Sequence, residues 1–263
     1  MAGSPAIRFR QASVVYPSGV RGLDRLDLDI PHGDLVVIVG LSGAGKSTML
    51  RAVNGLVTIT GGDVEVEGRS VRSSRGKALR ELRAGAGMIF QDYRIVRRLS
   101  VLQNVLVGRV ARVPTWRQLI GMWPKEDVEL AFDSLDRVGL VDRAYVKAGQ
   151  LSGGQQQRVG IARALAQKPS VILADEPVAS LDPVTSRRVM EDLRRINQDL
   201  GITTLVNLHF LDLAKEYAER IIGLSQGRLV FDGAGGDVTE GDFAEIYGRH
   251  MTADDVLEAQ VAL

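Results

Sequence analysis

The chain has 263 residues, which is enough to bury a sizeable core and is close to the upper size of a single domain. Apolar residues make up 45% and charged residues 25%, the balance of an ordinary soluble globular protein. The formal net charge is +1, so the composition gives no electrostatic indication of binding to nucleic acid or to anionic lipid. The sequence has no cysteine, which excludes disulfides and thiolate metal sites and fits a reducing cytosol.

The sequence predicts no membrane span of its own. Residues 1–8 contain no apolar core, so we expect no secretory signal. No apolar run approaches the ~18 residues that a membrane helix needs. We therefore expect a soluble chain that would act at a membrane only through a partner.

In chain order, the first predicted elements are strands. Alternating apolar positions at residues 7–16 and 26–30 predict half-exposed antiparallel strands. The continuous apolar run 36–39 predicts a strand buried on both faces, as in a parallel sheet. Similar runs follow at 171–174 and 203–208, separated by helical periodicity. This succession predicts an α/β core with a small antiparallel β layer at the N-terminus.

The sequence pattern in the middle of the chain predicts helices and no strand. Residues from about 92 to 165 contain helical patterns and no convincing strand, so we expect a helical subdomain inserted into the core. The predicted organisation is one domain, 1–263, with a core of about 1–91 and 166–248. Residues 249–263 form a polar and then apolar tail that we expect to be a frayed or loosely docked end.

Residues 40–47 (GLSGAGKS) satisfy the phosphate-loop pattern G-x-x-x-x-G-K-[ST] in full. Glycines in such a loop let the backbone amides wrap phosphate groups, and a helix that opens at Lys46 adds the positive end of its dipole. Lys46 is expected to pair with the β- and γ-phosphates, and the Ser47 hydroxyl to ligate Mg²⁺. A plain glycine turn is the alternative, but strand, loop and helix follow in the required order.

Two carboxylates, Asp175 and Glu176, end the buried run that starts at residue 171. The tip of such a strand is where sites form in α/β sheets. An acidic pair in this place, taken alone, is more often solvated or a helix cap.

Residues 151–155 (LSGGQ) stand between the phosphate loop and 171–176 (VILADE). With these three motifs, the chain resembles the ATP-binding-cassette (ABC) ATPases over roughly residues 7–248. The resemblance implies an α/β fold: a RecA-like P-loop NTPase core with an N-terminal antiparallel β layer and an inserted α-helical subdomain. It also implies an Mg²⁺-dependent ATPase with ATP and Mg²⁺ as cofactors.

The resemblance assigns roles around the γ-phosphate. Asp175 would hold Mg²⁺ through water, and Glu176 would act as the general base that polarises the attacking water. Gln91, after the predicted strand 87–90, matches the Q-loop glutamine that senses Mg²⁺ and water. His209, after the strand 203–208, matches the switch histidine that contacts the γ-phosphate and orients Glu176. Outside this context Gln91 would be a surface residue and His209 a structural one, as we expect for His32 and His250.

Tyr16 matches the aromatic residue that stacks on adenine in this family, with a core tyrosine as the alternative. The implied catalytic residues are Glu176, His209, Gln91 and Lys46, and the metal-binding residues are Ser47, Gln91 and Asp175. The implied ATP-binding residues are Tyr16, Gly40, Leu41, Ser42, Gly43, Ala44, Gly45, Lys46, Ser47 and Thr48.

The LSGGQ motif needs a second subunit. It stands at the start of a predicted helix, 155–166, whose N-terminus suits an anion. In the family this terminus closes on ATP bound to the opposite subunit, which implies a homodimer. Ser180 and Asp182 match the D-loop that crosses the interface. The motif residues are Leu151, Ser152, Gly153, Gly154 and Gln155.

One cassette without a membrane helix implies a separate subunit of a bacterial importer. Its partners would be transmembrane permease subunits and, indirectly, an extracytoplasmic binding protein, and it would lie on the cytoplasmic face of the inner (plasma) membrane. The finer resemblance is to phosphonate-importer ATPases. It is carried by residues 97–108, 113–116, 172–183, 207–209, 231–233 and 245–248.

Two positions depart from the family pattern. Phe210 stands where most importer ATPases have an acidic residue and the phosphonate group often has glutamine, and Leu41 stands where proline is common. Phosphate, phosphite or another small oxyanion is therefore an alternative cargo. A permease-free regulatory or DNA-associated ATPase is a third reading, but the balanced charge argues against it and we expect no nucleic-acid partner.

Both tryptophans fall in the predicted helical insert, near where the family meets its membrane partner. Aromatic residues are favoured at protein interfaces. Core filling is an equally good explanation for Trp116 and for Trp123.

Overall fold

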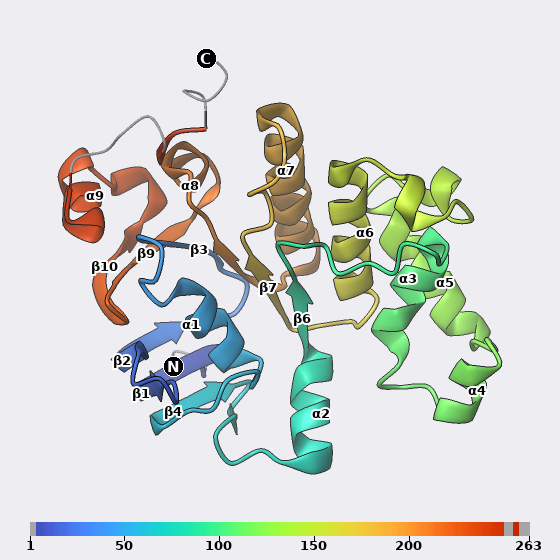
Figure 1. Cartoon of the computed structure of the whole chain (residues 1–263), viewed down its shortest axis with the longest axis horizontal. Helices are drawn as coiled ribbons and strands as arrows, with labels where there is room; N and C mark the ends of the chain where they lie inside the picture. Colours follow the sequence, from blue (N-terminus) through green and yellow to red (C-terminus); the bar gives the residue numbers. More distant parts are fainter. Residues whose placement is uncertain (1–3, 250–254, 258–263) are drawn as a thin grey trace.

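The computed structural model describes residues 4–249 and 255–257. A six-stranded sheet has the order β10-β9-β3-β8-β7-β6, and a four-stranded sheet has the order β2-β1-β4-β5 (Figure 1). The strands are β1 Ile7–Val15, β2 Arg21–Ile30, β3 Leu35–Val39, β4 Gly61–Val66, β5 Arg69–Ser70, β6 Ala86–Ile89, β7 Val171–Asp175, β8 Thr203–Asn207, β9 Arg220–Ser225 and β10 Arg228–Ala234. The α-helices are α1 Lys46–Val53, α2 Gly76–Gly85, α3 Val101–Leu106, α4 Thr115–Leu119, α5 Lys125–Asp136, α6 Gly153–Leu165, α7 Pro183–Leu200, α8 Leu211–Tyr217 and α9 Glu240–Tyr247.

The central strands of the larger sheet are buried on both faces, as their apolar runs predicted. Every residue of β3, β7 and β8 is buried. Side chains of β3 alternate between two hydrophobic clusters: Val36 and Ile38 join one, and Leu35, Val37 and Val39 join the other. Helix α1 lies between the two sheets, and α6 and α7 cover the opposite face (Figure 1).

The smaller sheet confirms the two predicted N-terminal strands, which pair antiparallel. Strand β2 begins at Arg21, earlier than the alternating pattern predicted. The alternation is broken because Arg25 adopts a left-handed φ of 50° and the register with β1 shifts there. Strands β4 and β5, which the sequence analysis did not predict, complete the sheet.

Helices fill the stretch between β6 and β7, where no strand is formed by the described residues. Helix α3 starts with a capping box in which Ser100 and Gln103 satisfy each other's backbone amides. Residues of α3, α5 and α6 join the same hydrophobic cluster as one face of the six-stranded sheet. The helical character of residues 92–165 is thus confirmed, while the division into core and subdomain stays a prediction.

Part of the C-terminal tail, which we expected to be frayed or loosely docked, contacts the rest of the chain. Leu257 is 1% exposed, its backbone amide donates to Asp212 of α8, and Arg249 pairs with Asp255 at 2.7 Å. The tail reaches the core because Leu257 joins the large hydrophobic cluster. Residues 250–254 and 258–263, His250 included, lie outside the described residues.

No helix in the described part of the chain has the length and apolarity needed to cross a membrane.

Candidate functional site

The phosphate-loop glycines are required by backbone geometry. Residues 40–45 connect β3 to α1, and Gly40, Gly43 and Gly45 have φ of 146°, 80° and 107°. A Cβ at Gly40 would lie 2.3 Å from the carbonyl oxygen of Leu224, and one at Gly45 would lie 2.4 Å from that of Gly22. Any side chain at either glycine would therefore displace the backbone of a neighbouring strand or loop.

Lys46 is buried inside this loop, with only 4% of its surface exposed. Its ammonium donates to the carbonyl oxygens of Gly40 (2.5 Å) and Leu41 (3.1 Å). Burial lowers the pKa of Lys46, and the nearby carboxylates Glu176 and Asp175 oppose that shift. A buried cation that is solvated by carbonyl oxygens is suited to pair with an incoming anion.

Asp175 collects three donors at the carboxyl end of β7. The Ser47 hydroxyl lies 2.7 Å from its Oδ1, and the Asn207 amide nitrogen 2.9 Å from the same oxygen. Arg51 Nη2 lies 3.4 Å from Oδ2. The structure thus brings together Ser47 and Asp175, which the sequence predicted as metal ligands.

Glu176 and His209 form a direct pair. His209 Nε2 lies 2.6 Å from Glu176 Oε1. The hydrogen bond from His209 lowers the pKa of Glu176, with a smaller opposing effect of burial. The predicted general base is therefore an ionised carboxylate that faces the buried Lys46 charge.

Tyr16 lies beside helix α1, at the start of which the phosphate loop ends. Its phenol oxygen is 3.0 Å from Thr48 Oγ1. It lines an open cavity together with most of the predicted ATP-binding residues and Glu176. The lining residues are Tyr16, Val20, Arg21, Gly22, Ser42, Gly43, Gly45, Lys46, Ser47, Thr48 and Glu176.

Gln91 and Ser180 lie elsewhere. They line a second cavity together with Tyr93 and Gln156. Gln91 is exposed there, on the turn after β6, and does not line the phosphate-loop cavity. Gln91 thus lines a different cavity from Ser47.

The LSGGQ residues begin helix α6. Ser152 and Gln155 form a capping box, and Leu151 is 7% exposed. A Cβ at Gly154 would lie 2.2 Å from Cγ2 of Thr185, so a side chain at that position would require Thr185 or the packing of α6 on α7 to shift. The described residues of the phosphate-loop cavity include none of these five.

Asp182 has a local structural role beside its predicted one. Its side chain caps α7 by accepting from the Thr185 amide at 2.9 Å. The hydrogen bond from the Thr185 side chain, followed by this backbone contact, lowers the pKa of Asp182. An N-cap aspartate stabilises a helix start by satisfying a free backbone amide.

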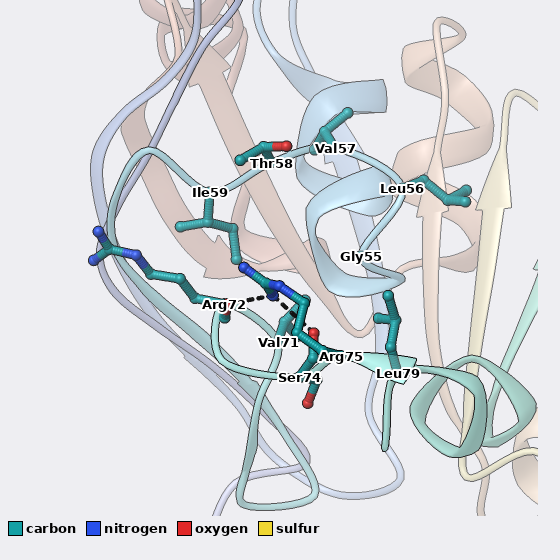
Figure 2. Close-up of a pocket in the computed structure, with 10 residues that line it drawn as sticks. All are labelled: Gly55, Leu56, Val57, Thr58, Ile59, Val71, Arg72, Ser74, Arg75 and Leu79. Carbon is teal, nitrogen blue, oxygen red and sulfur yellow. Dashed lines mark hydrogen bonds between the residues drawn. The ribbon is translucent and has the colours of Figure 1, made fainter. Parts of the chain in front are cut away.

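A further cavity is lined by none of the predicted site residues. Figure 2 shows it between the segment after α1 and the segment that joins β5 to α2, with Arg72 and Arg75 on one side. The Arg75 guanidinium donates to the carbonyl oxygens of Arg72 and Ser74, at 2.7 and 2.8 Å.

Sequence reasoning missed two residues at the site, Asn207 and Arg51. The available signal for Asn207 was a single amide in an otherwise apolar or hydroxyl-bearing buried run, 203–208. For Arg51, the signal was its place one helical turn after Ser47.

Comparison with known proteins identifies the family of this chain. The model of a family described as ABC transporter matches residues 23–179. A protein of Bacillus anthracis named "Phosphonates import ATP-binding protein PhnC" is 56% identical over 255 residues, which cover 97% of this chain and 99% of the relative. The chain belongs to the ABC transporter family. A Staphylococcus aureus protein of the same name is 55% identical and is aligned over 95% of this ABC chain and 98% of its own.

Solved ABC cassettes share the fold. A dimeric cassette bound to ADP and Pi is 32% identical, with a TM-score of 0.75, over 88% of this chain and 100% of that chain. A nucleotide-free cassette is 26% identical, with a TM-score of 0.77, over 92% of this chain and 94% of that chain. The predicted ABC ATPase fold class is thus confirmed.

The residues of this ABC chain fit a nucleotide with a divalent cation. No group of three or more histidine, cysteine or acidic side chains that could hold a metal alone is formed by the described residues. Mg²⁺ suits such a site, because it is usually held by one or two protein ligands, water and substrate phosphates. The buried Oδ1 of Asn207, beside Ser47 and Asp175, accepts no hydrogen bond from a described residue. Water bound to a cation is a donor that would satisfy it.

Proposed function

We propose that this chain is the ATP-binding and ATP-hydrolysing subunit of an ABC importer for phosphonates. The observation that carries the hydrolytic part is the Glu176–His209 contact of 2.6 Å beside the phosphate loop. The phosphonate cargo is supported by two relatives, 56% and 55% identical over nearly the whole chain, whose names state phosphonates import.

In this proposal the phosphates of ATP lie on the loop amides and pair with Lys46, and the adenine stacks on Tyr16. Ser47 and Asp175 would hold Mg²⁺, which supplies neutralisation of phosphate charge when bound. Glu176 accepts a proton from the attacking water, and His209 keeps that carboxylate ionised and oriented. Gln91 would join Ser47 and Asp175 on the metal side.

A second copy of the chain completes the site. The LSGGQ helix start, with Ser152 exposed, would close on ATP bound to the partner, and Ser180 and Asp182 would lie at the same interface. The dimeric cassette among the solved neighbours supports this arrangement. The homodimer would bind permease subunits on the cytoplasmic face of the membrane and would act indirectly with an extracytoplasmic binding protein. Within each copy, we propose residues 92–165 as the helical subdomain.

The direct test is ATPase activity of the reconstituted transporter and its binding protein, with a panel of phosphonates, phosphite and phosphate. Stimulation by phosphonates above phosphate is the expected result. Stimulation by phosphate or phosphite alone would keep the ATPase role and change the cargo. Intact basal hydrolysis that none of these ligands stimulates would contradict the proposed cargo class.

A further inference from the structure

A buried amide lies beside the predicted magnesium ligands. Asn207 ends β8, which lies between β3 and β7, and none of its surface is exposed. Burying an amide costs free energy unless its polar atoms are hydrogen-bonded. Apolar residues fill the same strand at Leu205 and Val206, so packing alone does not explain an asparagine here.

The sheet register determines what the amide contacts. Asn207 pairs with Asp175 across the parallel strands β8 and β7, so both side chains leave neighbouring strands at the same level. The amide nitrogen of Asn207 lies 2.9 Å from Asp175 Oδ1 and 3.4 Å from Ser47 Oγ. Ser47 Oγ lies 2.7 Å from the same Asp175 oxygen, so the three side chains close a triangle.

The donors and lone pairs of this triangle fix the Ser47 hydroxyl. Asp175 Oδ1 accepts from both the hydroxyl and the amide, which uses its two lone pairs. The only hydrogen of the Ser47 hydroxyl is therefore directed to Asp175. One amide hydrogen of Asn207 faces both Asp175 Oδ1 and, more weakly at 3.4 Å, Ser47 Oγ, which leaves a lone pair of Ser47 Oγ for a cation.

The second amide atom gives independent support. Asn207 Oδ1 is buried and has no hydrogen-bond donor among the described residues. An acceptor left in that condition costs free energy, so it normally has a partner in the working state. Water in the coordination shell of a cation at Ser47 has the required chemistry.

We propose that Asn207 is a positioning residue for Mg²⁺, acting through Ser47 and Asp175 rather than by ligating the metal. The inference rests on the proposed function, in which these two residues hold the cation. Groups that orient metal ligands typically contribute about 10- to 100-fold in metal affinity. Asn207 also stands two residues before His209, so one short backbone segment carries the contacts to both Asp175 and Glu176.

The test measures the binding of ADP, which is not hydrolysed, by titration calorimetry with Mg²⁺ and with EDTA. The informative quantity is the Kd in EDTA divided by the Kd in Mg²⁺. We expect Asn207→Ala to lower this ratio by about tenfold or to bring it to one, because the metal ligands lose their orientation. The Kd in EDTA should stay close to that of the wild type.

Asn197 provides a matched control. It is 2% exposed and its amide nitrogen donates to two carbonyl oxygens, of Gly33 and Ile202, at 2.7 and 2.9 Å. Asn197→Ala should lower Tm but keep the wild-type ratio. Asn207→Leu keeps the branched shape of the side chain without its polar atoms and, should the alanine variant fail to fold, is expected to show the same loss of the ratio.

Two results would overturn the inference, and they are distinguishable. If Ser47→Ala loses the Mg²⁺ effect while Asn207→Ala and Asn207→Leu keep it, Asn207 is structural only, like Asn197. If Ser47→Ala itself keeps the wild-type ratio, the proposed metal role of Ser47 is wrong and the inference fails with it.

Discussion

Glu176 combines an unusual backbone with a short side-chain contact. Its φ of 52° lies in the left-handed region, which costs a non-glycine residue about 1–2 kcal/mol. That turn, immediately after β7, carries the carboxylate to His209 and into the phosphate-loop cavity. Strain of this kind, which surrounding structure must maintain, is found preferentially at functional sites.

Replacement of this carboxylate should separate binding from hydrolysis. In Glu176→Gln the side-chain shape remains but the proton acceptor is lost, so turnover should fall by about 10²- to 10⁴-fold. ATP affinity should change little, because Lys46 and the loop amides are untouched. Parallel measurements of ATP binding and of phosphate release test this. Rapid turnover by the variant would contradict the general-base role.

The pairing with His209 predicts a pH effect. The pKa of Glu176 is lowered chiefly by the His209 hydrogen bond, while burial acts in the opposite direction. His209→Ala removes the lowering contact, so the pKa of Glu176 should rise and less of the base should be ionised at a given acidic pH. The acid limb of kcat/KM should therefore move to higher pH.

His209→Gln is the control for that experiment, since an amide donor of similar reach can keep the hydrogen bond. Its acid limb should move less than that of His209→Ala. An acid limb that stays at the wild-type pH in both variants would show that His209 does not set the ionisation of Glu176.

At the scale of elements, the helical region is joined by a buried ion pair. Arg109 Nε lies 2.6 Å from Asp127 Oδ1 of α5, and its Nη1 donates to the carbonyl oxygen of Ala166, at the end of α6. Both charged side chains are about one-tenth exposed. The guanidinium thus connects α5 and α6 to the segment after α3.

Loss of Arg109 should be costly, because the Asp127 carboxylate would stay buried without its partner. We expect Arg109→Leu to lower the free energy of unfolding by about 3–5 kcal/mol. Glu129→Gln, in the exposed pair with Lys125 on the same helix, should change it by no more than about 0.5 kcal/mol. Denaturant unfolding of both variants measures the difference. Equal effects would show that burial does not distinguish the two pairs.

Local patterns predicted some elements and not others. Residues 35–39 were recognisable because every one is apolar and buried. Strand β4 starts with two glycines and an aspartate, and only Val64 and Val66 are buried, so its alternation is too short to detect. Strand β5 has two residues, and its pairing with β4 depends on a turn rather than on hydrophobic periodicity.

At the candidate site, residues that belong to a sequence motif could be predicted, whereas a residue that acts only through a tertiary contact could not. Lys46, Asp175 and His209 were identified because their motifs resemble a known family. The contact between Asn207 and Asp175 depends on the register of β8 against β7, residues 32 apart in sequence. No local pattern specifies that register, so the role of the amide required the structure.

At the scale of the whole molecule, the two tryptophans differ in their exposure to solvent. Trp123 is partly buried and packs against the large hydrophobic cluster, as core filling predicts. Trp116 on α4 is 57% exposed, with the Arg117 guanidinium carbon 5.2 Å from its ring centroid. Only Trp116 is therefore available for a partner.

We expect Trp116→Ala to weaken assembly with the permease while ATP binding is spared, because its ring is exposed on the insert, outside the nucleotide cavity. Trp123→Ala should instead lower Tm. Co-purification with the permease and thermal unfolding of both variants separate the two roles. Undiminished co-purification of Trp116→Ala would exclude this ring from the interface.

The hydrophobic cluster that runs from α3 and α5 through α6 to β3 and β8 has an energetic consequence. Helices and a sheet that share one apolar interior stabilise each other, so the helical region should unfold together with the sheet rather than separately. A nucleotide that binds only the folded phosphate loop stabilises the native state by mass action. The shared interior extends that stabilisation to the helical region. When nucleotide is bound, the backbone amide hydrogens of α5 should therefore exchange with solvent more slowly, although α5 does not contact the ligand.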